Sequence, residues 1–319
     1  MVPPPMARAP TPKVEDFDLR RATDARGFLG EYARMGGFTP KALADGVDVL
    51  RRMTKDGAKV LLSFPAAPIA TGMRGVLVEL VRRGLVHGLI TTCGTLDHDL
   101  ARTWGAYHHG TFQADDAELF RKGFHRLGSV LVPKDSYGEL LEERLTQPLK
   151  DLFARTKSVS TRELSRYLGE TLDDEPERET SLLWQCYKHD VPLFIPGPTD
   201  GAVGSQIWMR YQQDRSIRFD LLKDEQDLSD LTHGAKRLGG LILGGGISKH
   251  HLIWWAQFRG GLDYAVAVTT AVEYDGSLSG ARLREAISWG KLKAKAPHVT
   301  IEGDATLIVP LLVAGWLAA

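Results

Sequence analysis

The chain has 319 residues, of which 43% are hydrophobic and 25% are charged, a balance typical of a folded globular protein rather than a disordered one. Its 40 lysine and arginine residues are matched by 40 aspartate and glutamate residues, so no long-range attraction to nucleic acid or to an anionic membrane is expected. Cys93 and Cys186 are too few for a disulfide framework or a four-thiolate metal site.

The two ends of the chain carry no obvious targeting signal. Residues 1–12 lack the apolar core of a secretory signal, and the apolar stretch 306–319 is too short to span a bilayer. We therefore expect a cytoplasmic protein that binds no metal, nucleic acid or membrane. Prolines between residues 3 and 12 prevent regular structure, so residues 1–16 are predicted to form a mobile tail ahead of one catalytic domain over 17–319.

Helical and strand-like patterns alternate along the rest of the chain. The first half predicts, in order, helices over 25–35 and 40–55, a strand over 60–64, a helix over 75–83, a strand over 86–92, a helix over 96–104, an apolar run over 128–132 and helical spacing over 140–168. Residues 170–179 are acidic and contain a proline, which indicates an exposed loop.

The second half continues the same alternation. It predicts a helix over 181–189, an apolar run over 192–195, strands over 219–222, 240–243, 264–269 and 298–301, and helices over 227–238, 249–259, 282–288 and 305–316. Short, continuously apolar strands between helices are typical of a mainly parallel sheet that is covered on both faces. The predicted fold class is therefore α/β, as a single large Rossmann-like domain.

Segments that follow the predicted strands are the first candidates for a binding site, because ligands of open parallel sheets bind beyond the carboxyl ends of the strands. These segments are 63–65, 91–95, 197–201, 244–246, 269–271 and 303–305. Many contain glycine or a hydroxyl side chain, which suits a nucleotide phosphate near helix N-termini. The triple glycine equally fits a tight turn, and Asp200 and Asp304 equally fit helix caps.

A carboxylate, an indole and a lysine occur close together near residue 290. Glu285 and Trp289 are four residues apart and share a helix face, and Lys291 follows Gly290, where the helix is expected to end. This combination suits a cationic aliphatic amine, because a carboxylate neutralises an ammonium group and an indole adds a cation–π contact. A helix with a buried tryptophan and a solvated lysine fits the same spacing.

Long, ordered motifs of this chain closely resemble those of deoxyhypusine synthases. They lie at 244–251, 261–265, 270–271, 275–281, 285–291 and 303–305, with further similarity at 91–94, 126–133, 198–201 and 310–314. The resemblance implies an enzyme that uses NAD to take hydride from spermidine and holds the resulting butylimine on a lysine. It also implies that the group passes to one lysine of the hypusine-bearing translation initiation factor and is reduced there.

The resemblance assigns roles to individual residues of this chain. Lys291 is expected to form the enzyme imine, and His250 to act as the base. The expected NAD contacts are Thr92, Cys93, Gly94, Asp200, Gly245, Thr270, Asp304 and Ala305. The expected substrate-binding residues are Asp275, Gly276, Ser277, Glu285, Trp289, Asp97, His98 and Ser205. The family also implies a homotetramer whose active sites are shared between paired subunits.

Several positions depart from the family pattern. Ser205 and Leu278 stand where aspartate is common, and Trp254 stands where asparagine is common. Two lost carboxylates weaken the binding of a triply charged amine, since each charge-assisted contact contributes about 1.5–3 kcal/mol, and Asp97 or Glu273 is a candidate replacement. Two alternatives therefore stay open: a homospermidine-synthase-like transfer to putrescine, and a catalytically idle NAD- or polyamine-binding paralogue.

Overall fold

Six parallel strands form the central sheet of the computed structural model, which describes residues 12–318. The strands lie in the order β11 (His298–Glu302), β10 (Tyr264–Thr269), β9 (Leu238–Leu243), β1 (Lys59–Ser63), β2 (Gly88–Ile90) and β7 (Leu193–Phe194). Ranked along the chain, this is the order 6-5-4-1-2-3 of doubly wound dinucleotide-binding folds. The chain therefore reverses its winding direction between β1 and β9, and the predicted α/β class is confirmed.

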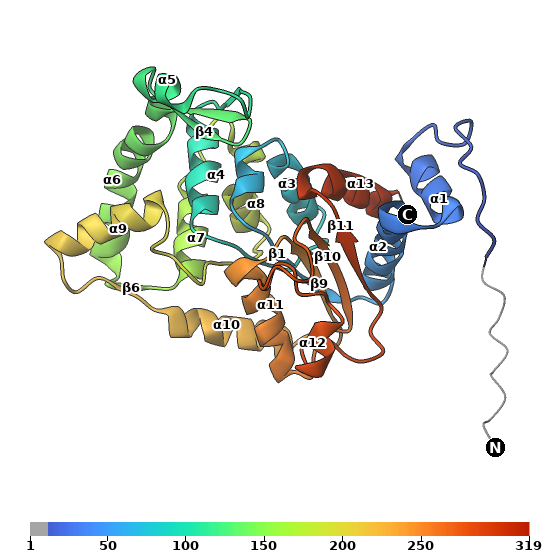
Figure 1. Cartoon of the computed structure of the whole chain (residues 1–319). Coiled ribbons are helices and arrows are strands. Elements are labelled where there is room, and N and C mark those ends of the chain that lie inside the picture. The colour runs from blue at the N-terminus through green and yellow to red at the C-terminus, as the bar shows by residue number, and fades with distance from the viewer. Residues whose placement is uncertain (1–11, 319) are drawn as a thin grey trace.

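Both faces of this sheet are covered by helices, as the alternating side chains of the strands require. Val60 and Leu62 of β1 point into one core and Leu61 into the other. Helices α2 (Phe38–Lys55) and α13 (Ala305–Leu317) cover the first face, and α10 (Leu221–His233) and α11 (Gly246–Phe258) lie on the opposite side (Figure 1). Parallel strands buried on both faces explain why the sequence shows continuous apolar runs.

Two aspartates of helix α4 (Gly94–Trp104) hold neighbouring helices by capping them. Asp97 accepts hydrogen bonds from the first two backbone N–H groups of α9 (Ala202–Gln213), both at 2.8 Å. Asp99 accepts from the first two N–H groups of α8 (Leu182–Lys188), at 2.9 and 2.8 Å, and from Arg74 of α3 (Arg74–Arg82) at 3.3 Å. These buried carboxylates satisfy N–H groups that a helix leaves unpaired at its start.

Smaller elements surround the central sheet. Strands β3 (His108–His109), β5 (Val130–Pro133) and β4 (Phe124–Leu127) form an antiparallel sheet beside α5 (Asp116–Arg121), and β6 (Ser158–Val159) pairs in parallel with β8 (Arg218–Phe219). The remaining helical elements are α1 (Ala25–Met35), α6 (Gly138–Arg155), α7 (Thr161–Glu170), α12 (Glu285–Ser288), η1 (Ala67–Ala70), η2 (Lys134–Ser136) and η3 (Arg178–Thr180). No helix within residues 12–318 has the length and apolar character needed to cross a membrane.

Two sequence predictions of secondary structure are wrong, and some elements were not predicted. The helical spacing over 140–168 is divided between α6 and α7, because Ser160 begins α7 with a reciprocal capping box to Glu163. The predicted strand over 219–222 ends at Phe219, since Asp220 caps α10 there. Helix α9 and the antiparallel sheet were not predicted. Most of the predicted tail, residues 1–11, lies outside the described residues; Glu15 within it donates its backbone N–H to Arg34 of α1 at 3.2 Å.

The buried cap at Asp99 predicts a large effect on stability. Asp99→Asn is expected to lower the free energy of unfolding by about 3–5 kcal/mol, because it leaves the buried guanidinium of Arg74 without its carboxylate and turns an amide toward the N–H groups of α8. Urea denaturation measures the change. The control is Glu79→Gln, which breaks ion pairs to the exposed Arg82 and Arg83 and should cost less than about 1 kcal/mol. Equal losses in the two variants would contradict the assignment.

Candidate functional site

A cavity of about 780 Å³ lies where the sheet reverses its winding, beyond the carboxyl ends of β1, β9, β10 and β11. Its volume is typical of small-molecule and cofactor sites. Four of the expected NAD contacts line it: Gly245, Thr270, Asp304 and Ala305. Phe112, Leu127 and Gly128 close it from the antiparallel sheet. The structure thus brings half of the expected cofactor residues to the position that the strand order favours.

Two helix N-termini border this cavity. Gly245 is the residue before α11, and Asp304 is the residue before α13, where its carboxylate accepts a hydrogen bond from the N–H of Leu307 at 3.2 Å. Helix N-termini present unpaired N–H groups and a positive end of the helix dipole, which suits a phosphate. Asp304 therefore caps α13, as the sequence suggested, and it also lines the cavity.

A second, smaller pocket of about 270 Å³ collects the predicted amine-handling residues. Lys291, His250, Glu285 and Trp289 all line it, although His250 and Lys291 are 41 positions apart along the chain. Lys291 is only 7% exposed, and its Nζ lies 5.2 Å from the centre of the Trp289 ring. A lysine, an imidazole, a carboxylate and an indole in one small pocket can bind an amine and move protons on it.

The charges of this pocket favour a neutral imidazole. Partial burial and, to a smaller extent, the positive charge of Lys291 lower the pKa of His250 below its ordinary value, so His250 is available to accept a proton near pH 7. Burial lowers the pKa of Lys249 to about 8, with Glu285 opposing that shift. The Nζ of Lys249 donates to the backbone carbonyls of Leu278 and Ala281, at 2.6 and 2.7 Å.

One loop forms the wall between the cavity and the pocket. Ser279 lines the large cavity and the adjacent Leu278 lines the small pocket. The loop is held from the sheet side by Thr269, whose Oγ1 donates to the carbonyl of Ser279 at 3.1 Å. It packs so closely on Gly245 that a Cβ there would lie 2.1 Å from Oγ of Ser279. Only glycine fits beneath this loop.

The outer part of the same loop holds three more predicted residues. Oδ1 of Asp275 accepts hydrogen bonds from the N–H and the hydroxyl of Ser277, both at 2.7 Å, and these bonds lower the pKa of Asp275. Gly276 has a φ of +75°, a left-handed conformation that favours glycine. These three residues form an exposed turn and line neither of the two hollows, the large cavity and the Lys291 pocket.

A third group of predicted residues lies apart from both hollows. Thr92, Cys93 and Gly94 follow β2, and the exposed Asp200 and Ser205 flank the start of α9. The two segments adjoin each other, since a Cβ on Gly201 would lie 2.8 Å from Sγ of Cys93. The Cys93 thiol is buried, which raises its pKa to about 12. Within one chain these residues do not reach Lys291 or line the large cavity.

Asp97 and His98 do not take the positions expected of substrate contacts. Asp97 is 1% exposed, and both of its oxygens are used by the cap of α9 and by the hydroxyl of Tyr137. It therefore acts as a helix cap rather than as a replacement pocket carboxylate. His98 forms a 2.9 Å hydrogen bond with the hydroxyl of Tyr107, and burial lowers its pKa to about 4. It packs among tyrosines instead of facing an open site.

Two pocket residues were missed as site candidates by sequence reasoning. Trp254 lies one helical turn after His250, and the two rings stack with centres 5.5 Å apart. Lys249 precedes His250, and its Nζ donates a hydrogen bond to the carbonyl of Leu278 in the dividing loop, the loop around Leu278 and Ser279 between the cavity and the pocket. The spacing of four between His250 and Trp254 places them on one helix face, and this was the signal in the sequence that would have identified Trp254.

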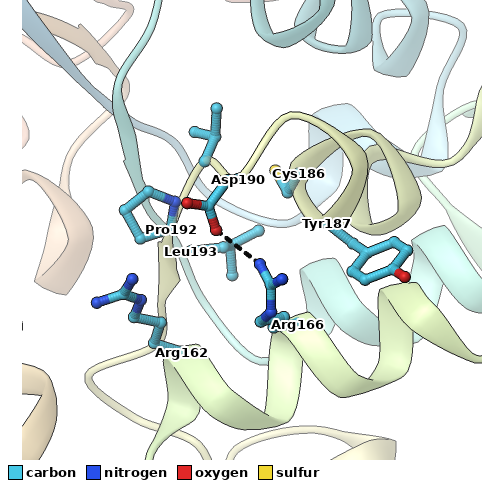
Figure 2. Close-up of a pocket in the computed structure, with 8 residues that line it drawn as sticks. Arg162, Arg166, Cys186, Tyr187, Asp190, Pro192 and Leu193 are labelled. Carbon is cyan, nitrogen blue, oxygen red and sulfur yellow. Dashed lines mark hydrogen bonds and ion pairs between the residues drawn. The ribbon is translucent and has the colours of Figure 1, made fainter.

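A separate crevice between α7 and β7 carries no comparable chemistry. Figure 2 shows Arg166 of α7 pointing at Asp190, with which it forms an ion pair at 2.6 Å. The crevice has only about 10 Å³ of free space, room for about one water molecule. It contains none of the predicted site residues.

Known proteins similar to this chain agree with the geometry. A family model described as deoxyhypusine synthase matches residues 27–316. A "probable deoxyhypusine synthase" of Picrophilus torridus is 49% identical over 304 residues, which cover 95% of this chain and 96% of that protein.

Solved structures share the fold at low sequence identity. A protein of Entamoeba histolytica, named provisionally as a deoxyhypusine synthase, has a TM-score of 0.69 and 19% identity, with 96% of this chain and 97% of that chain covered. AgrE in a ternary complex with ornithine and NAD+ has a TM-score of 0.50 and 15% identity, with 87% of this chain and 33% of that longer chain covered. At these identities the two structures show a common fold.

The buried Lys249 predicts a pH-dependent contribution to stability. Its pKa falls from an ordinary value of 10.5 to about 8 on folding, so between these pH values the unfolded chain binds more protons than the folded chain. The free energy of unfolding should therefore rise with pH from about 8 to 10.5, relative to Lys249→Met. Urea denaturation across this range gives the difference. The control, Lys249→Arg, keeps its charge throughout and should not reproduce the rise; a pH-independent difference between wild type and Lys249→Met would contradict the shift.

Proposed function

Because the chain belongs to the deoxyhypusine synthase family, we propose that it transfers the aminobutyl group of spermidine to one lysine of the hypusine-bearing translation initiation factor, with Lys291 as the covalent centre. The observation that carries this proposal is the convergence of Lys291, His250, Glu285 and Trp289 in one pocket. The pocket shares a loop wall with a cavity of dinucleotide size at the point where the sheet reverses its winding.

The large cavity is the proposed site of NAD. Its features fit a dinucleotide: a glycine without a side chain at position 245, two helix N-termini, and carboxylate and hydroxyl acceptors at Asp304 and Thr270. AgrE, which shares the fold, has been solved with NAD+ and ornithine. Bound in this cavity, NAD would supply the acceptor for a hydride, which carries two electrons away from the amine carbon.

The pocket residues have distinct proposed roles. Glu285 pairs with an ammonium group of the amine, and the neutral His250 takes the proton from the amine that loses hydride. The neutral amine of Lys291 then adds to the imine carbon, so that a carbon–nitrogen bond to Nζ forms as the bond to 1,3-diaminopropane breaks. The proton of Nζ leaves with the released diamine. The butylimine passes to the acceptor lysine by the same exchange, and the retained hydride reduces it.

A second copy of the chain is proposed to complete the site. Ser205 and Trp208 are exposed on α9, Trp208 by 59%, and the exposed Asp200 lies just before this helix. The Lys291 pocket also has exposed aromatic residues in its lining, with Trp289 62% and Trp254 40% exposed. Apolar surfaces of this kind are usually covered by a partner. Contact between the α9 surface of one subunit and the pocket surface of the next would bring α9 to the Lys291 pocket, as in a homotetramer with shared active sites.

Transfer to putrescine is the second candidate. Leu278 lines the pocket where an aspartate is common in the family, and Glu285 is the one carboxylate among the residues that line it. A pocket with fewer carboxylates suits putrescine, an amine with fewer positive charges than spermidine, as well as it suits a protein lysine. The roles of Lys291 and NAD would be the same with either acceptor.

The covalent role of Lys291 predicts the outcome of a mass measurement. Incubation of the enzyme with NAD, labelled spermidine and the initiation factor should add an aminobutyl group to the factor, and Lys291→Arg should reduce this by at least about a thousand-fold. Arginine keeps the positive charge but cannot form the imine. Labelled homospermidine without labelled factor would contradict the protein acceptor. The absence of a borohydride-trapped, spermidine-dependent adduct on Lys291 would contradict the transferase itself.

The dividing loop packs tightly on Gly245, so one added methyl group at this position should weaken the binding of NAD. Gly245→Ala places a Cβ where Ser279 now lies, so the cavity wall must move and NAD should bind at least about tenfold more weakly. The control is Gly75→Ala in α3, where a Cβ meets no atom within 4 Å. Calorimetric titration measures both affinities. An unchanged NAD affinity in Gly245→Ala would contradict the assignment of NAD to this cavity.

A further inference from the structure

Trp254 forms a second aromatic wall beside Lys291. Nζ of Lys291 lies 5.5 Å from the centre of the Trp254 ring and 5.2 Å from that of Trp289, both within the range of a cation–π contact. Trp254 belongs to α11 and Trp289 follows α12, so two separate elements contribute indoles to the same nitrogen. The first indole is held in place by its stack on His250, with an interplanar angle of 24°.

The other cationic groups of the pocket, Arg282 and Lys249, are already engaged. Arg282 pairs with Glu302 at 2.5 Å, and Lys249 donates to two backbone carbonyls. Lys291 has no carboxylate within 4.0 Å of its Nζ among residues 12–318. Leu278, which lines the pocket wall, carries no charge either. Glu285, the one carboxylate that lines the pocket, makes no ion pair with Lys291, so the two indole faces are the groups that lie within cation–π range of this buried nitrogen.

We propose that Trp254 and Trp289 form an aromatic cage for the cation at the Lys291 nitrogen, and that the cage favours the protonated imine over the ammonium group. The inference rests on the proposed function, which places an imine there. In the exchange at Lys291 the new carbon–nitrogen bond leaves one positive charge on a planar C=N group, while the proton departs with the diamine. A planar, delocalised cation lies flat against an indole face, as a guanidinium does, whereas a tetrahedral ammonium does not.

A purely structural role does not account for Trp254. Trp254 is 40% exposed, and apart from its stack on His250 it makes an edge-on ring contact with Phe258, which is itself 52% exposed. Such a residue contributes little to the core. The next residue, Trp255, offers the contrast: it faces away from the pocket and donates its indole N–H to Glu225 of α10.

The test measures the fraction of Lys291 that sodium borohydride traps as the aminobutyl adduct, at saturating NAD and spermidine. Trp254→Leu keeps an apolar side chain but removes the aromatic face, and should lower the trapped fraction about three- to tenfold. Trp254→Phe keeps a weaker face and should retain more than half of the wild-type yield. NAD affinity should stay unchanged in both variants. Trp255→Phe is the matched control on the same helix and should behave as wild type.

The outcomes separate the two proposals. If wild type itself gives no adduct, the proposed function fails. If wild type gives the adduct and Trp254→Leu gives as much, the function stands and the cage is overturned. Should Trp254→Leu fold poorly, judged by circular dichroism and thermal melting, fluorinated tryptophans weaken the ring face without changing its shape. Their stepwise effect on the yield should be larger in wild type than in Trp254→Phe, and equal effects would overturn the cage.

Discussion

The packing of the dividing loop on Gly245 is the contact on which both hollows of this chain depend. Residue 245 ends the turn between β9 and α11, at the reversal point of the sheet, and Ser279 rests directly on its backbone. Any side chain at 245 would displace the loop. With the loop in place, one side of it closes a cavity of dinucleotide size and the other side closes a pocket around a buried lysine. One missing Cβ thus sets the boundary between the cavity and the pocket.

Much of the fold was predictable because the central strands are buried on both faces. The six-residue strand β10 gives a continuous apolar run between helices, and the pattern led directly to a parallel sheet. The antiparallel strands were missed because they are only two to four residues long, too short to show a period. The break between α6 and α7 was missed because both helices carry the same apolar spacing, and only the capping box at Ser160 interrupts it.

The candidate site was predictable where its residues are close in the sequence and have one role. Lys291, Glu285 and Trp289 lie within seven residues of one another, and the strand-end rule located Gly245 and Asp304. Asp97 shows the limit. A sequence shows a carboxylate but not its donors, and here two N–H groups from α9, more than 100 residues away, occupy it. The separation of Asp200 and Ser205 from the Lys291 pocket was equally hidden, since it depends on how α9 is anchored to α4.

The loop between the two hollows also has a thermodynamic consequence. Leu278 and Ser279 are joined by one peptide bond, yet they line different hollows, and Lys249 and Thr269 hold the peptide from either side. A ligand that shifts one residue therefore shifts the other. The factor by which the first ligand changes the affinity for the second must equal the factor in the reverse direction. Under the proposed function, this reciprocity would couple the binding of NAD in the cavity to the binding of the amine in the pocket within a single subunit, and so link the oxidation step to the reduction step.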